Sequence, residues 1–249
     1  MMSKKYIIIS PILLILLWAI VSQLQLVDKF FLPDPLTTLT QLIELIKSGV
    51  IIGDIFSTLG RVAISFAIAV VIGLPLGLWL GSSEKIYRSF EFVIDFFRST
   101  PATALFPLFL LIFGITDKSK IAVTAFAAIL IIIFNTAHGV MNARKSRVLA
   151  AKIMGATKTQ IFRWILFWES LPQTFIGLRS AISLSLVVIV VTEMFIGTPS
   201  GLGRRIIDSQ ITYEIPTMYA VIILTGIVGY LLNLVFILIE KRFLHWNGK

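Results

Sequence analysis

Long apolar runs recur along this sequence, and they restrict the chain to folds that can place such runs in a lipid bilayer. A helix needs about 20 mostly apolar residues to cross a hydrocarbon core about 30 Å thick. One run, at 103–114, is short by itself but is extended backwards by 90–97. The sequence therefore predicts an all-α integral membrane protein with about six transmembrane helices, near residues 6–24, 57–80, 103–114, 121–140, 175–196 and 217–239.

The composition of the chain also indicates a membrane environment. Of the 249 residues, 57% are hydrophobic and 14% are charged, whereas an ordinary soluble domain has roughly 25% charged residues. The net charge of +9 would suit a nucleic-acid binder, but such proteins gather basic side chains on one polar face. Here the basic residues lie in short segments between apolar runs. We therefore expect contact with membrane lipid and no nucleic-acid partner.

The sequence offers few groups for metal binding or catalysis. It has no cysteine, which excludes disulfides and thiolate metal sites. Its two histidines, His138 and His245, are far apart, so a centre with several histidines is not expected. Serine, aspartate and histidine residues do not fall into a spacing typical of hydrolases. We therefore expect no metal site and no catalytic residue.

The first apolar run has the flanks of a retained helix. It follows Lys4 and Lys5, and no small-x-small cleavage site comes after it, so a removable signal peptide is not indicated. In the next segment, 28–54, Pro33 and Pro35 open an amphipathic stretch that we expect at the membrane interface. We therefore divide the chain into residues 1–54, a transmembrane helix with a periplasmic amphipathic segment, and residues 55–249, the main transmembrane domain.

Lysine and arginine residues indicate the orientation, because cytoplasmic loops of membrane proteins are enriched in both. If the N-terminus is inside, the inner segments hold about twice as many of them as the outer ones. We therefore predict that both termini are cytoplasmic. The longest inner segment then lies between the fourth and fifth spans, at 142–164.

That inner segment, 142–164, is patterned as two short helices. Ser146 can cap the first helix, and Gly155 can end it because glycine tolerates the left-handed conformation at a helix C-terminus. Thr157 and Gln160 then have the spacing of a capping box for a second helix. The first helix would carry a small apolar stripe suited to docking on another protein, although it could equally pack on its own bundle. The stripe consists of Ala150, Ala151 and Met154.

The sequence Leu-Ala-Ala-Lys-Ile-Met-Gly at 149–155, followed by Ile165 and by Leu-Pro at 171–172, resembles the "EAA" loop (E-A-A-x3-G-x9-I-x-L-P) of ABC importer permeases with the type I fold. Other motifs look like the nitrate/sulfonate/taurine branch of that family: Arg-Ser-Thr-Pro at 98–101, Asn-Thr at 135–136, Gly-Leu-Arg at 177–179, Glu-Met at 193–194 and Gly-Leu-Gly at 201–203. Two positions depart from the loop pattern: Leu149 stands at the acidic position and Trp168 at a proline position.

The resemblance implies a multi-pass permease subunit of the bacterial cytoplasmic (inner) membrane, in which 55–249 is the permease domain. It implies a second permease subunit, with a homodimer favoured, two ATP-binding subunits, and an extracytoplasmic substrate-binding protein. A nitrate-, bicarbonate- or sulfonate-like anion is the favoured cargo. The 142–164 segment would contain a coupling helix that contacts the ATPase through Leu149, Ala150, Ala151, Met154, Gly155 and Ala156.

The chain itself is not expected to bind a nucleotide. It contains no G-x-x-x-x-G-K-[ST] phosphate loop, and its Gly-Lys pair is Gly248-Lys249. We therefore expect no cofactor on this chain, with ATP and Mg²⁺ held by the partner ATPase, and we do not expect an enzyme. The alternative is an ATP-independent secondary transporter or channel, although the internal repeats common in secondary transporters are not evident.

Three glycines, Gly73, Gly77 and Gly81, form overlapping G-x-x-x-G steps on the second span. Such steps let a neighbouring helix approach closely, either within the subunit or at a dimer seam.

Polar groups at membrane depth need partners or mark a pathway. Arg98 follows Asp95 at a spacing that permits an ion pair within one helix. Alternatively, Arg98 with Pro101, at a helix break, lines a pathway or gate. Asn135, Arg179 and Glu193 can likewise either pair with other side chains or line the pathway. If Asn135 has a structural role, we expect it to hydrogen-bond across helices.

Overall fold

The computed structural model describes residues 5–195 and 197–244. The regular elements in these residues are helices. In chain order they are α1 (Lys5–Gln23), α2 (Pro35–Lys47), α3 (Val50–Gly81), α4 (Glu84–Ser99), the 3-10 helix η1 (Ala102–Leu105), α5 (Phe106–Phe113), α6 (Asp117–Met141), α7 (Lys145–Ile153), α8 (Lys158–Ile161), the π-helix η2 (Phe162–Leu166), α9 (Phe167–Phe195), α10 (Leu202–Ile211) and α11 (Ile215–Phe243).

Four continuous helical segments are long and apolar enough to cross a membrane, and a bent pair of helices makes a fifth candidate. The four are Val50–Gly81, Asp117–Met141, Lys158–Phe195 and Ile215–Phe243. The prediction of an all-helical membrane protein is confirmed; about six spans were predicted, and the described residues contain four candidate spans, or five if the bent pair is one span. The first predicted span coincides with α1 (Lys5–Gln23), in which Ile9–Gln23 is an apolar helix. The end of the fifth predicted span, Ile196, lies outside the described residues.

The third predicted span is broken. α4 and the segment Ala102–Phe113 are bent by 89° at their junction. Pro101 accounts for the break, because a residue before proline is disfavoured in the α region. Thr100 accordingly has extended dihedrals, with φ −79° and ψ 123°. The two pieces are therefore separate helices.

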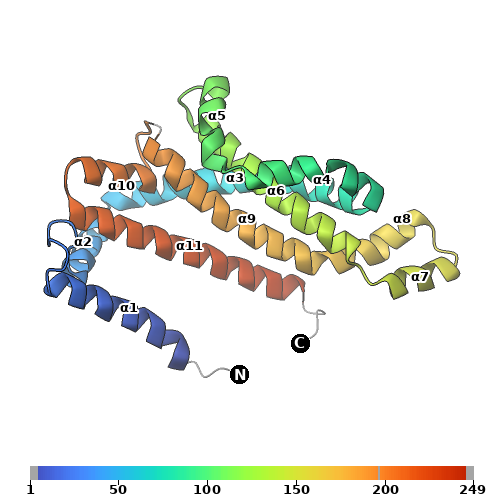
Figure 1. Cartoon of the computed structure of the whole chain (residues 1–249), viewed down its shortest axis with the longest axis horizontal. Helices are drawn as coiled ribbons and strands as arrows, with labels where there is room; N and C mark the ends of the chain where they lie inside the picture. The colour runs from blue at the N-terminus through green and yellow to red at the C-terminus, as the bar shows by residue number, and fades with distance from the viewer. Residues whose placement is uncertain (1–4, 196, 245–249) are drawn as a thin grey trace.

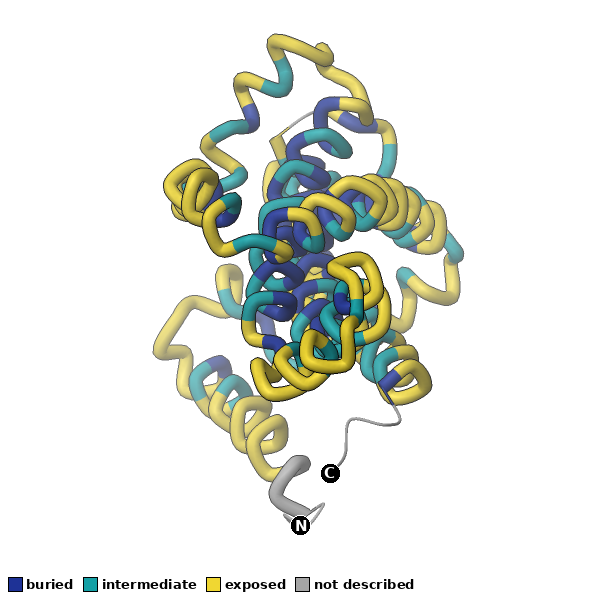
Figure 2. Tube along the Cα trace, turned by 90° about the vertical axis from the view of Figure 1, so that its right-hand side faces the viewer, coloured by how far each residue is buried: buried dark blue, intermediate teal, exposed yellow. Residues whose placement is uncertain are grey.

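Three long helices form the centre of the bundle. α3, α6 and α9 contact one another, and α11 packs against α9, α10 and α2 (Figure 1). α2 and α10 lie at one end of the bundle, and α7 and α8 lie at the opposite end (Figure 1). Seen from the end that carries α7 and α8, the buried residues lie in the middle of the molecule and the exposed residues surround them (Figure 2).

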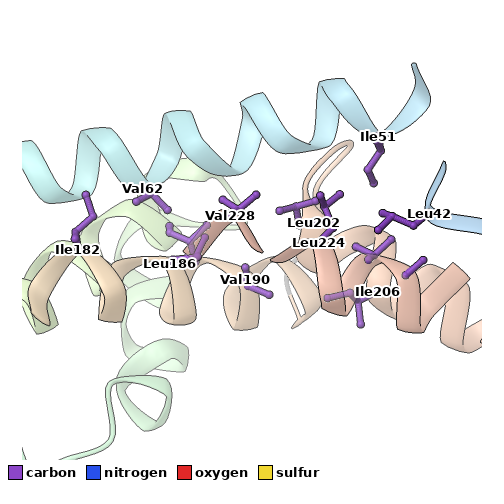
Figure 3. Packing of buried hydrophobic residues seen from close by; sticks show 13 residues of the cluster. Leu42, Ile51, Val62, Ile182, Leu186, Val190, Leu202, Ile206, Leu224 and Val228 are labelled. Carbon is purple, nitrogen blue, oxygen red and sulfur yellow. The ribbon is translucent and has the colours of Figure 1, made fainter. Parts of the chain in front are cut away.

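A large apolar cluster fills the space between α3, α9, α10 and α11 (Figure 3). Ile51 and Leu202 are fully buried in it, and Leu42 of α2 closes it at the end that carries α10. Because lipid tails are as apolar as these side chains, close van der Waals packing, and not removal from water, stabilises such a cluster between membrane helices. This cluster fixes the position of α10 relative to the central helices.

The expected amphipathic stretch forms α2. Asp34 caps this helix by accepting a hydrogen bond of 2.9 Å from the backbone N–H of Thr37. This bond and a second one from the Thr37 hydroxyl hold the pKa of Asp34 below its usual value. The start of α2 is therefore fixed by a charged cap.

Candidate functional site

The N-cap of α7 lies two residues before the predicted one. The sequence predicts Ser146 as the N-cap, but the N-cap is Arg144, and Ser146 lies in the first turn. Glu169 of α9 explains the earlier start, because its carboxylate accepts a hydrogen bond from the backbone N–H of Arg144. The same carboxylate pairs with Arg147 at 2.6 Å. A side chain from a distant part of the sequence therefore replaces the expected local cap.

The end of α7 has the predicted geometry. Gly155 has a φ of +79°, and its N–H donates to the carbonyl of Lys152 while the N–H of Ala156 donates to that of Ala151. These two bonds form a Schellman motif, which glycine favours because it has no Cβ. The following capping box between Thr157 and Gln160 is also present. The segment is therefore a short helix, a tight turn and a new helix that continues into α9.

The α7–α8 turn exposes apolar side chains. Leu149, Ile153 and Met154 are 59%, 80% and 86% exposed. Beside them is a hollow of about 400 Å³ at the turn, with Trp164 in its wall. We call Leu149, Ala150, Ala151, Ile153, Met154, Gly155, Ala156 and Trp164 the α7 surface. It contains all six residues predicted to contact an ATPase, and Ile153 and Trp164 are additions that the loop pattern did not indicate.

A second site, which is polar, lies at the opposite end of the bundle. Glu193 of α9 is fully buried there. Its carboxylate accepts bonds from the Arg61 guanidinium at 2.6 Å, from the Thr58 hydroxyl at 2.9 Å and from the backbone N–H of Gly203 at 3.0 Å. A carboxylate with this many donors can be held at depth without solvent.

Further ion pairs extend this site, which we call the Glu193 cluster. Asp117 accepts from Arg61 at 3.0 Å and from buried Lys120 at 2.9 Å. Asp54 accepts from the backbone N–H of Gly201 at 2.8 Å and pairs with Arg205. Three carboxylates thus meet three cations, so the cluster is electrically balanced. It joins α3, α6, α9 and α10.

Arg61 and Asp54 are absent from the sequence-based candidates, although a signal for them exists. Asp54, Thr58, Arg61 and Ser65 are spaced four, three and four residues apart, and all are buried on one face of α3. A polar stripe with helical spacing on an apolar helix indicates a buried network. The partners of that stripe come from distant segments and could not be assigned from spacing.

A third site is the cavity of about 410 Å³ at the α4–α5 break, lined in part by Arg98 and Pro101. The predicted pair is present, since Arg98 donates to Asp95 at 3.1 Å. The Arg98 guanidinium also lies 3.5 Å from the centroid of the Phe134 ring. The Arg98 side chain is 33% exposed, so part of its charge faces the cavity.

The other residues predicted for a pathway lie elsewhere. Asn135 of α6 accepts a bond of 2.9 Å from Gln173 of α9, which is the expected bond across helices. Arg179 lies 3.7 Å from Glu240 of α11, and Glu193 belongs to its own cluster. Arg98 and Pro101 therefore line one cavity, and the remaining three residues are not among those that line it.

The three glycines of α3 face α6 of the same chain. A Cβ on Gly77 would lie 2.7 Å from Cβ of Thr136, and one on Gly81 would lie 2.6 Å from the carbonyl oxygen of Ala137. A Cβ on Gly73 would lie 3.0 Å from Cβ of Ile132. The helices approach so closely that any side chain would force them apart.

The sequence of this chain is similar to those of known transport proteins. Residues 73–245 match the family of binding-protein-dependent transport system inner membrane components. A nitrate import permease of Synechocystis sp. is 34% identical over 180 residues, 72% of this chain and 65% of the relative. A taurine transport system permease of Escherichia coli is 26% identical over 241 residues, 95% of this chain and 87% of the relative.

A solved structure has the same fold. It is an inward-facing conformation of the MetNI methionine ABC transporter, with a TM-score of 0.67 and 23% identity over 79% of this chain and 97% of that chain. Together with the family match over residues 73–245, these similarities identify the chain as a non-catalytic, multi-pass inner-membrane permease of a bacterial ABC transporter, a member of the binding-protein-dependent transport system inner membrane components.

Proposed function

We propose that this permease pairs with a second copy of itself to form the pathway of an ATP-driven importer. Two separate ATPase subunits bind ATP and Mg²⁺, dock on the α7 surfaces, and drive alternating access. An extracytoplasmic binding protein delivers a small anion, nitrate-, bicarbonate- or sulfonate-like, to the end that carries α2 and α10. In this assignment both chain termini are cytoplasmic.

The observation that carries this proposal is the exposed apolar α7 surface. Ile153 and Met154 are more than three quarters exposed, although both could have been buried against the bundle. Exposed apolar patches of this kind mark docking sites for other proteins. Schellman geometry at Gly155 and the capping box at Thr157 fix the turn, so the surface is preorganised for a partner.

Charge supports the orientation. The segment from α7 to the start of α9 carries basic residues at the end opposite α2 and α10 (Figure 1). Segments rich in lysine and arginine favour the cytoplasmic side. The ATPase must also reach α7 from the cytoplasm, so both arguments assign the same side. The residues are Arg144, Lys145, Arg147, Lys152, Lys158 and Arg163.

The importer can be separated from a secondary transporter by reconstitution in lipid vesicles. We expect ATP hydrolysis by the complex of this chain with its ATPase to rise when a loaded binding protein is added, and solute uptake to require ATP. The chain alone should move no solute. Uptake by the chain alone, driven by a proton or sodium gradient, would replace the importer with the alternative, a secondary transporter or channel.

We propose that the cavity at Arg98 and Pro101 forms part of the pathway for the anion. In the reconstituted importer, Arg98→Gln should lower the uptake rate at least tenfold, because a hydrogen bond to a charged group contributes about 1.5–3 kcal/mol. Stimulation of the ATPase by the binding protein should persist. Uptake and ATP hydrolysis are measured on the same vesicles.

Arg88→Gln is the matched control for Arg98→Gln. Arg88 lies on the same helix and forms a surface pair of 2.7 Å with Glu84, and exposed pairs of this kind contribute little. Arg98→Lys should retain more of the uptake rate than Arg98→Gln, because it keeps the charge. Equal uptake by all three variants would remove Arg98 from the pathway.

A further inference from the structure

A groove of about 760 Å³ lies at the α7–α8 end of the bundle, where three helical segments meet. One wall is formed by the last two turns of α3, including Leu78 and Trp79. Phe162 and Leu166 of η2 also line the groove. These side chains make the interior of the groove apolar.

The groove has a positively charged edge. Lys152 of α7 and Lys158 of α8 both contribute to its lining, and both are exposed. Among the described residues neither lysine has an ion-pair partner, and none of those that line the groove is acidic. The edge is therefore positive and is not neutralised by the chain itself.

The groove differs in charge from the hollow next to it. A neighbouring polar hollow of about 500 Å³ at the same end is lined by Arg88 and Lys145, but also by Glu84 and Glu91. Its charges largely compensate one another. An excess of cations beside an apolar wall therefore distinguishes the groove from its surroundings.

We infer that the groove binds an anionic phospholipid of the membrane leaflet next to α7. The phosphate lies beside Lys152 and Lys158, and an acyl chain lies along Leu78, Trp79 and Phe162. Basic pockets between helices on the cytoplasmic side of membrane proteins bind anionic lipid headgroups. Half of Trp79 is exposed, which suits an indole ring at the membrane–water interface.

The lipid groove and the hollow at the α7 surface take different residues from α7, and both are lined by Ile161 of α8. The hollow beside Met154 and Trp164 is lined by Ala151, Gly155 and Ala156, whereas the groove takes Val148 and Lys152 from α7. Bound lipid can therefore support α7 from the bundle side while leaving the α7 surface accessible. The inference uses the proposed orientation only to name the leaflet, and its test does not require transport.

Quenching of Trp79 by brominated lipid tests the inference directly. In the full chain, Trp18, Trp164, Trp168 and Trp246 are replaced by phenylalanine, so that fluorescence reports on Trp79. We expect dibrominated phosphatidylglycerol to quench Trp79 with a relative affinity ten- to thirtyfold above that of dibrominated phosphatidylcholine, since each lysine near the headgroup contributes about fivefold.

We compare the lipid preference of two double variants with that of the parent chain. Lys152→Ala with Lys158→Ala should reduce the preference to less than threefold. Lys85→Ala with Lys145→Ala removes the same charge at the same end but outside the groove, and should leave the preference unchanged. An equal preference in both variants, or none in the parent, would overturn the assignment.

A second measurement covers the case in which the single-tryptophan chain does not fold. Native mass spectrometry of the unmodified chain should retain phosphatidylglycerol over phosphatidylcholine, and the lysine variant should lose that selectivity. The quenching or retention is then repeated in the complex with the ATPase. Loss of the lipid in that complex would mean that the groove belongs to the ATPase docking surface, and the lipid assignment would fail.

Discussion

Gly155→Val should uncouple ATP hydrolysis from transport. Gly155 has a φ of +79°, a region that costs an L-residue about 1–2 kcal/mol and is a genuine outlier for a β-branched side chain. Its Cβ would meet nothing within 4 Å, so the substitution acts on the backbone and not through a clash. The α7–α8 turn should therefore open and shift the α7 surface. We expect ATP hydrolysis to continue while uptake falls at least tenfold.

Gly49→Val is the matched control for this prediction. Gly49 has a φ of +74° and also has no atom within 4 Å of an added Cβ. It lies between α2 and α3, at the end of the bundle opposite α7. The two variants therefore carry the same backbone strain at different ends. If both reduced uptake equally, or if Gly155→Val kept normal coupled uptake, the ATPase contact at α7 would be refuted.

The α7 region shows why local signals were sufficient for some features and not for others. The end of α7 and the capping box at Thr157 depend on residues within five positions of one another, and both predictions are confirmed. The start of α7 depends on Glu169, which is 25 residues from Arg144. Short-range spacing could not identify that partner, so the prediction of Ser146 as the cap was wrong.

The same distinction applies to the membrane helices. Apolar runs predicted the four long candidate spans, because hydropathy is read from consecutive residues. The helix break at Pro101 was also predicted and is present, but the 89° angle between the two pieces could not be predicted, because a proline ends a helix without fixing the direction of the next one. The Glu193 cluster joins α3 to residues more than 100 positions away, and only the tertiary structure brings these together.

Arg61→Met should produce the largest loss of stability in the Glu193 cluster. It removes the 2.6 Å partner of a fully buried carboxylate, and breaking a buried ion pair from one side costs about 3–5 kcal/mol. The loop before α10 should loosen as well, because Arg61 also donates to the carbonyl of Ser200 at 2.9 Å. We expect the midpoint of thermal unfolding, followed by tryptophan fluorescence in detergent, to fall by about 10 °C.

Two further variants decide whether the buried charge is the cause of that loss. Arg204→Met makes the same substitution in the exposed Arg204–Asp208 pair, whose side chains are 40% and 41% exposed, and should cost less than about 1 kcal/mol. Adding Glu193→Gln to Arg61→Met removes the unpaired carboxylate while an amide oxygen still accepts from Thr58 and Gly203, so part of the stability should return. Glu193→Gln alone gives the reference for additivity. If the fall in melting temperature of the double variant equalled the sum of the falls in the two single variants, Arg61 and Glu193 would not be energetically coupled. The cluster would then be a set of separate contacts and not one network.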